Sequence, residues 1–158
     1  MCGICGVFKF NEESFNDVKL TNLMKSISNR GKDSKGIFKN TDIFLGHHRL
    51  SIIDTSDKSN QPMVIEDYVI VFNGIIYNYK DIRKKLIAKG HIFKSTGDTE
   101  VVIRSYIEFG DKCVELFDGV FAFCIYHLIK KNIFLARDRI GIKPLYYSIN
   151  DNQLVFSS

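Results

Sequence analysis

The C-terminal part of the chain alternates short β-rich runs with links of turn length, and this pattern constrains the fold most. The runs lie at residues 120–127, 132–137, 145–149 and 154–156. The first two are joined through LIKKN, which is typical of a hairpin. Strands joined by such short links pair antiparallel, because a parallel pair needs a long crossover. The sequence therefore predicts antiparallel sheet here.

Further strands and three helices are expected upstream. β-rich runs predict strands at residues 2–10, 43–53 and 68–72. Apolar residues at helical spacing predict helices at residues 16–28, 78–89 and 99–109. Asn16 is a candidate N-cap of the first helix, Gly90 and Gly110 stand just after the other two, and RGKDSKG at 30–36 is typical of a structured loop. Because helices do not follow every strand, the pattern indicates an α+β fold with more than one sheet-like layer.

Composition is that of an ordinary globular domain. With 158 residues, 45% of them hydrophobic, the chain can form one domain over 1–158. The net charge of +4 comes from scattered lysines and arginines with acids among them, which indicates a solvated surface rather than a nucleic-acid interface. No signal peptide or membrane span is recognisable, and the spread of four cysteines fits a reducing compartment, so a cytoplasmic location is expected. The strand-like ending LVFSS indicates a piece of something longer.

The opening MCGICGVFKF allows two kinds of cysteine chemistry. Cys2 and Cys5 could form a redox or zinc pair, but side chains alternate along a strand and would send the two thiols to opposite faces. A zinc site would need His47 or His48, which likewise face opposite ways. Alternatively, removal of Met1, which a small second residue favours, would make Cys2 the first residue. Its α-amine could then take the proton of its own thiol.

Three other positions are candidates for chemistry, each with a structural alternative. Asn73 and Gly74 offer an amide side chain and a backbone N–H to an oxyanion, or form a plain Asn-Gly turn. Arg49, inside an apolar strand, reaches solvent or meets an anion such as a carboxylate. Asp98, just before a helix, is an N-cap or accepts from an ammonium group.

A series of motifs in order resembles one known family. The motifs are CGI-x-G, RG-x-DS-x-G, LGHHRLSIID, QPM, NG-x-IYNY, GDTEVV, DGVFAFCIY and ARDRIGIKPLYY. Together they cover nearly the whole chain and resemble class II (N-terminal nucleophile) glutamine amidotransferase domains. The closest resemblance is to the glutaminase domain of glutamine-hydrolysing asparagine synthetases. The resemblance implies a four-layer αββα sandwich of two antiparallel sheets, the fold of N-terminal nucleophile hydrolases.

The resemblance also implies roles for individual residues. Cys2 would be the nucleophile with its α-amine as the base, and Asn73 with the Gly74 N–H would form the oxyanion hole. Arg49 would bind the α-carboxylate of L-glutamine, and Asp98 its α-ammonium. Backbone groups of Leu50, Ser51, Ile52, Ile53 and Ile75 would complete the pocket. No metal or cofactor is implied for this domain.

Two departures from the family pattern bear on function. The usual RGPD is RGKD, so Lys32 replaces a proline and the loop is expected to be less rigid. The usual NGEIYN is NGIIYN, so Ile75 replaces a glutamate and glutamine affinity is in doubt. A catalytically weak or inactive module that binds a ligand or regulates is therefore the alternative to an enzyme.

The resemblance further implies an absent C-terminal synthetase domain. That domain would use ATP and Mg to activate aspartate or another carboxylate, and this chain carries no phosphate-binding loop for it. The expected partners are L-glutamine and the synthetase domain, with neither nucleic acid nor membrane, and a homodimer is one assembly open to the chain.

Overall fold

Nine strands and three helices make up the computed structural model, which describes residues 1–158. The strands are β1 (Gly3–Lys9), β2 (Ser34–Lys39), β3 (Ile43–Arg49), β4 (Met63–Ile65), β5 (Tyr68–Ile76), β6 (Gly119–His127), β7 (Asn132–Arg137), β8 (Tyr146–Ile149) and β9 (Gln153–Ser157). The helices are α1 (Asp17–Ser26), α2 (Tyr79–Ala88) and α3 (Asp98–Phe109), and short 3-10 helices cover Asp57–Ser59 and Gly110–Leu116.

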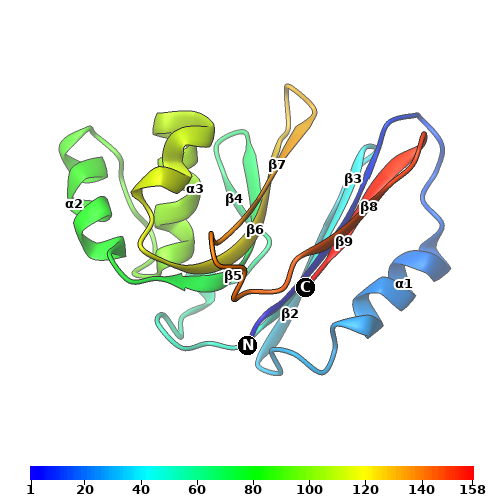
Figure 1. The fold of residues 1–158 in the computed structure, drawn as a ribbon, viewed down its shortest axis with the longest axis horizontal. Coiled ribbons are helices and arrows are strands. Elements are labelled where there is room, and N and C mark those ends of the chain that lie inside the picture. The colour runs from blue at the N-terminus through cyan, green and yellow to red at the C-terminus, as the bar shows by residue number, and fades with distance from the viewer.

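Two antiparallel sheets face each other between helical layers (Figure 1). The first sheet has the strand order β2-β3-β1-β9-β8, and the second has the order β4-β5-β6-β7. Helix α1 covers the outer face of the first sheet, and α2 and α3 cover the outer face of the second (Figure 1). The predicted α+β fold with an αββα arrangement is confirmed.

Alternation along the strands separates the core into layers. On β1, Ile4 faces the second sheet, whereas Cys5 packs outward against α1, where its Sγ lies 3.7 Å from Met24 Sδ. On β5, Val69 and Val71 face the first sheet, whereas Ile70 and Phe72 face α2 and α3. The predicted divergence of neighbouring side chains on β1 is therefore confirmed.

The three helices form where the sequence predicts them. The Asn16 side chain accepts a hydrogen bond from the Lys19 N–H at 3.1 Å and caps α1. Gly90 and Gly110, after α2 and α3, both have positive φ values, of 96° and 63°. No helix of the structure has the length and apolar character needed to cross a membrane.

Four strand predictions need correction. Strand β2 takes up residues 34–39, part of which was expected to be loop, and β4 was not predicted at all. Strand β3 ends at Arg49 rather than at residue 53, so residues 50–53 form a loop. Strand β5 continues past Phe72 to Ile76, so the Asn-Gly turn predicted as the alternative at 73–74 does not form.

Gly74 explains why this Asn-Gly pair sits in a strand. Its φ is not positive, and it pairs with Phe121 in β6. A Cβ atom at Gly74 would lie 2.5 Å from the Val120 carbonyl oxygen and 2.7 Å from the Phe121 Cα. The glycine therefore allows β6 to approach closely and does not serve a left-handed turn.

Candidate active site

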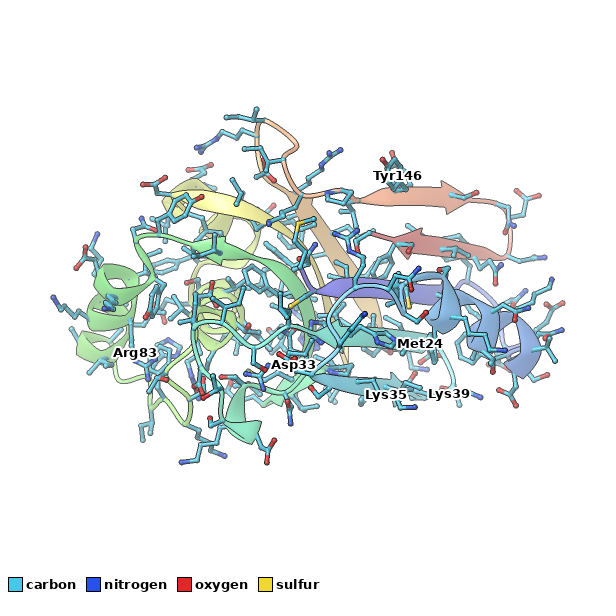
Figure 2. All side chains as sticks on the ribbon, turned by 90° about the horizontal axis from the view of Figure 1, so that it is seen from below. Met24, Asp33, Lys35, Lys39, Arg83 and Tyr146 are labelled. Atoms are coloured by element: carbon cyan, nitrogen blue, oxygen red, sulfur yellow. The ribbon has the colours of Figure 1, made fainter.

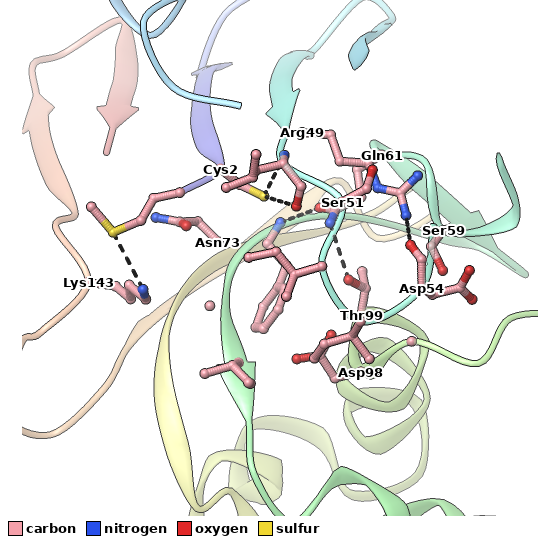
Figure 3. A pocket seen from close by; sticks show the side chains of 18 residues that line it. Cys2, Arg49, Ser51, Asp54, Ser59, Gln61, Asn73, Asp98, Thr99 and Lys143 are labelled. Carbon is pink, nitrogen blue, oxygen red and sulfur yellow. Dashed lines mark hydrogen bonds between the residues drawn. The ribbon is translucent and has the colours of Figure 1, made fainter. Parts of the chain in front are cut away.

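Cys2 and Asn73 lie at the same end of the space between the two sheets. Cys2 precedes β1 and stands two residues before Ile4, which faces the second sheet. Asn73 follows Val69 and Val71 on the face of β5 that looks toward the first sheet. Each of the two residues lies two positions along the chain from an inward-facing apolar side chain. Both line one pocket (Figure 3).

The pocket has a volume of about 190 Å³ and opens beside the N-terminus. Residues of the loop after β3, of β5 and of the start of α3 line it. All ten predicted site residues line it: Cys2, Arg49, Leu50, Ser51, Ile52, Ile53, Asn73, Gly74, Ile75 and Asp98.

The Cys2 side chain rests against the first residue after β3. Its Sγ lies 3.3 Å from the Leu50 amide nitrogen and 3.6 Å from the Leu50 carbonyl oxygen. The Leu50 N–H thus donates to the sulfur. Arg30 Nε donates to the Cys2 carbonyl oxygen at 3.1 Å, which fixes the backbone on the other side.

Two hydrogen-bond donors beside Cys2 have no partner in the chain. Asn73 Nδ2 is buried without any acceptor. On β5, the N–H groups of Phe72 and Ile76 point away from β6, because they donate to Gln61 Oε1 and Asp98 Oδ2. By alternation the Gly74 N–H points to the same edge, and β4 pairs no further along β5 than Ile70. The pair therefore offers two donors to a ligand oxygen.

Arg49 places an uncompensated positive charge in the pocket wall. Its side chain is 6% exposed, and no carboxylate lies within salt-bridge distance of it. Nη1 donates to the Ser56 carbonyl and to Asn60 Oδ1, at 3.0 and 2.8 Å, and Nη2 donates to the Asp54 carbonyl. These bonds use three of the five guanidinium N–H groups, so a carboxylate ligand could take the others.

Asp98 supplies the opposite charge. It is the first residue of α3 and Gly97 is the N-cap, so the predicted N-cap role falls one residue earlier. One carboxylate oxygen accepts from the Ile76 N–H at 3.0 Å. Burial raises the pKa of Asp98 to about 6, although that hydrogen bond acts in the opposite direction. A cation beside it would stabilise the ionised form.

The remaining predicted site residues form the walls. The Ser51 N–H is already engaged by Asp33 Oδ2 at 2.7 Å, so this backbone donor is not free for a ligand. Asp33 also donates its N–H to the Arg49 carbonyl, which ties the loop down one residue after Lys32. Ile75 brings an aliphatic side chain to the pocket, where the related motif has a carboxylate.

Several residues that line or support the pocket were missed from the sequence. They are Arg30, Asp33, Asp54, Ser59, Gln61, Thr99 and Lys143. Arg30 and Asp33 lie in the RGKDS loop, whose polar and glycine content already indicated structure. Gln61 joins two elements, because its side chain accepts from the Phe72 N–H and donates to Thr99 Oγ1. Gln61 begins the QPM motif, but nothing in that motif indicates that its side chain joins two elements.

The paired-cysteine alternative finds no support in the geometry. Cys5 is buried against α1, all four cysteines are free, and no group of three or more His, Cys, Asp or Glu side chains could hold a metal ion. Burial raises the pKa of the Cys5 thiol to about 12, which makes it unreactive.

Comparison with known proteins identifies the family. Residues 1–158 match the family model of the glutamine amidotransferase domain. The chain is 40% identical over 179 residues to putative glutamine-hydrolysing asparagine synthetase 2 of Methanocaldococcus jannaschii. It is 36% identical over 163 residues to asparagine synthetase 3 of Bacillus subtilis, and both alignments cover 100% of this chain. The chain belongs to the glutamine amidotransferase domain family.

The related proteins are longer than this chain. It covers 34% of the M. jannaschii protein and 26% of the B. subtilis protein, so it spans about a quarter to a third of their lengths. Among solved structures, glutamine phosphoribosylpyrophosphate amidotransferase of B. subtilis superposes with a TM-score of 0.78 at 20% identity. That superposition covers 99% of this chain and 41% of the other, and it agrees with the fold class predicted from the sequence.

Proposed function

We propose that the chain hydrolyses L-glutamine to glutamate and ammonia through a thioester at Cys2. The observation that carries this proposal is the pair of donors in the pocket that also holds the Cys2 thiol: Asn73 Nδ2, which has no partner, and the Gly74 N–H, which points to the unpaired edge of β5. A buried amide donor without a partner is costly unless a ligand oxygen completes it. An oxyanion formed at a carboxamide carbon is such an oxygen.

Charge at the other end of the pocket supports an amino acid as the ligand. Arg49 would take the α-carboxylate and Asp98 the α-ammonium, so both buried charges gain a partner of opposite sign. The side-chain carboxamide would then extend toward Cys2. Ile75 contributes only apolar contact, so the affinity for glutamine depends on Arg49 and Asp98.

The reaction would proceed in two stages. The Cys2 thiolate attacks the carboxamide carbon, and the carbonyl electrons move onto the oxygen, which Asn73 and Gly74 hold. The C–N bond then breaks, ammonia leaves with a proton from the α-ammonium of Cys2, and a γ-glutamyl thioester remains. Water attacks the thioester next, and the C–S bond breaks to release glutamate and the thiol.

This mechanism requires removal of Met1. In the intact chain the nitrogen of Cys2 is an amide and cannot act as a base. Met1 is 61% exposed at the pocket, and its Sδ lies 3.5 Å from Lys143 Nζ, so it is open to an aminopeptidase. Intact mass measurement shows whether the purified chain has lost it.

The Asn73→Ala variant tests the proposal. Loss of one oxyanion donor is expected to lower kcat for glutamate release by about 10² to 10³, because the remaining donor cannot hold the developing charge alone. The measurement uses chains shown by mass to begin at Cys2. Asn152→Ala, an exposed site in the turn between β8 and β9, is the control and is expected to match the parent rate.

The outcome separates an enzyme from a binding module. An unchanged rate in Asn73→Ala would remove that residue from the mechanism. Absence of glutamate release from chains with a free Cys2 amine would instead favour a non-catalytic module, and glutamine binding measured by calorimetry would then describe its role.

We further propose that the chain supplies ammonia to a synthetase domain, as the names of its longer relatives suggest. ATP and Mg would be needed only by that domain. Determining the gene sequence that follows residue 158 is the direct test, since a phosphate-binding loop there would define the acceptor chemistry.

A further inference from the structure

Asp54 has a carboxylate that is fully occupied by the protein. Oδ1 accepts from the Ser56 N–H at 2.8 Å and from Ser56 Oγ at 2.6 Å. Oδ2 accepts from the Thr96 N–H at 2.7 Å and from Thr96 Oγ1 at 2.8 Å. Four donors satisfy a carboxylate, so Asp54 cannot bind a ligand although it lines the pocket.

The two sets of donors belong to the two segments that carry the charged residues of the site. Ser56 lies in the loop that holds Arg49, because the carbonyls of Ser56 and Asp54 itself accept from the guanidinium. Thr96 stands two residues before Asp98, just before the start of α3. Through Ser56 and Thr96, the Asp54 side chain therefore connects the segment that holds Arg49 with the segment that carries Asp98.

Asp54 is held in its ionised form. Burial opposes ionisation, but the hydrogen bonds from Ser56 and Thr96 outweigh it and lower the pKa of Asp54 well below its usual range. The connection thus persists through the physiological pH range. Asp98 differs, since it has spare acceptor capacity and a raised pKa, and only Asp98 is available to a ligand cation.

We propose that Asp54 is a positioning residue that sets the separation between Arg49 and Asp98 and so restricts the pocket to ligands carrying both an α-carboxylate and an α-ammonium group. This inference rests on the proposed function and concerns its substrate selectivity. A ligand with both groups needs Arg49 and Asp98 at one fixed separation. A ligand with a carboxylate alone needs only Arg49.

The test compares two substrates in the Asp54→Asn variant. Asparagine keeps the size of the side chain but replaces one acceptor oxygen with a donor nitrogen, which faces either the Ser56 or the Thr96 donors and breaks that connection. L-glutamine is compared with 4-carbamoylbutanoate, which has the same carboxamide and carboxylate but no α-ammonium. The KM for L-glutamine is expected to rise about tenfold or more, and that for 4-carbamoylbutanoate to change much less.

Two further readouts separate positioning from general damage. Alkylation of Cys2 by iodoacetamide does not use the α-groups, so its rate is expected to match that of the parent chain. The Asp151→Asn change, at an exposed turn position, is the matched control and is expected to alter neither KM.

Smaller changes cover the case in which Asp54→Asn does not fold. Thr96→Val and Ser56→Ala each remove one hydroxyl donor and keep the backbone donor and the carboxylate. Each is expected to reduce the preference for L-glutamine over 4-carbamoylbutanoate in the same direction and by a smaller factor.

The results decide the inference separately from the proposed function. If the parent chain releases glutamate but the variants keep the parent preference between the two substrates, Asp54 has no positioning role. If the parent chain releases none, the proposed function fails, and the same preference is read from the dissociation constants of the two ligands. A preserved ratio of dissociation constants would also overturn the inference.

Discussion

Asp54 and Asp98 are two buried carboxylates whose pKa values are shifted in opposite directions. Four hydrogen bonds keep Asp54 ionised. Burial instead raises the pKa of Asp98 to about 6, although backbone N–H groups of Ile76, Asp98 and Thr99 act in the opposite direction. Above that pH, Asp98 carries a charge with no counter-ion. The free chain therefore carries a destabilising charge that a bound cation would neutralise.

The Asp98→Asn variant is expected to be more stable than the parent without ligand. The folded chain binds a proton at Asp98 more tightly than the unfolded chain, so this stabilising contribution is present below pH 3.8 and is lost as the pH rises through about 6. Removing the charge should increase the free energy of unfolding on the order of 1–3 kcal/mol at neutral pH. The amide oxygen of the substituted side chain can still accept from the Ile76 N–H.

Denaturant unfolding at neutral pH and at about pH 4 measures this effect. The gain should shrink at the lower pH, where the parent carboxyl group is also largely protonated. Asp151→Asn, at an exposed turn, should show no gain at either pH. An Asp98→Asn variant less stable than the parent at neutral pH would contradict the argument.

At the scale of elements, β5 contributes to the site through both its side chains and its backbone N–H groups. Its side chains alternate between the two faces, which brings Asn73 toward Cys2, and its N–H groups alternate between the two edges, which frees that of Gly74. Two adjacent residues thus supply two donors through different geometry. A turn at this position would neither direct the Asn73 side chain toward Cys2 nor leave the Gly74 N–H on an unpaired strand edge.

Gly74→Ala tests the close approach of β6. The added Cβ would lie 2.5 Å from the Val120 carbonyl oxygen, so the strands must separate locally. Such overpacking typically costs about 1–3 kcal/mol, and the melting temperature should fall accordingly. Asn73→Ala is the neighbouring comparison and should not lower it, because Asn73 Nδ2 has no partner to lose. Equal melting temperatures for Gly74→Ala and the parent would refute this account.

At the scale of the whole molecule, packing between the sheets sets the distance between Cys2 and Asn73, the proposed nucleophile and the proposed oxyanion donor. Phe156 on β9 is 1% exposed, and its ring fills the space above Gly6 on β1. This inner layer separates the strand that carries Cys2 from the strand that carries Asn73. The outer layer, which includes Leu86 of α2, supports only the far face of β5.

Phe156→Leu and Leu86→Val should therefore differ in their effect on kcat. Each leaves a small void and is expected to cost about 1–2 kcal/mol of stability. Only the change in the inner layer alters the spacing of the two sheets, so only Phe156→Leu should lower kcat for glutamate release. Assays well below both melting temperatures make the comparison, and an equal loss of activity in both would show that the spacing does not depend on the inner layer.

Much of this architecture could be predicted from the chain itself. Helical spacing of apolar residues placed α1, α2 and α3 to within two residues at each end, and the short links in the C-terminal part predicted the antiparallel order. Edge strands were harder, because β2 alternates between half-buried and exposed residues and β4 has only three residues, so neither shows a strong apolar pattern.

The site was harder to predict than the fold. Figure 2 shows the side chains on the ribbon, among which the site residues are a small part. Residues defined by a distinctive type or motif, such as Cys2 and Arg49, could be selected from the sequence. Residues that act through long-range contacts could not: Asp54 reaches Thr96 across 42 positions and Gln61 reaches Thr99 across 38. The spacing of residues along the sequence does not indicate which distant residues form such hydrogen bonds.

Strand β4 contains no residue of the proposed reaction, yet its length controls the site. It pairs only with residues 68–70 of β5, and Pro62, directly before it, has no amide hydrogen with which to extend the ladder. A ladder continued as far as Gly74 would bring a backbone carbonyl to its N–H and occupy it. A relative could thus keep every proposed catalytic side chain and still lack activity. Its activity therefore has to be judged from the length of the strand beside β5 as well as from residue identity.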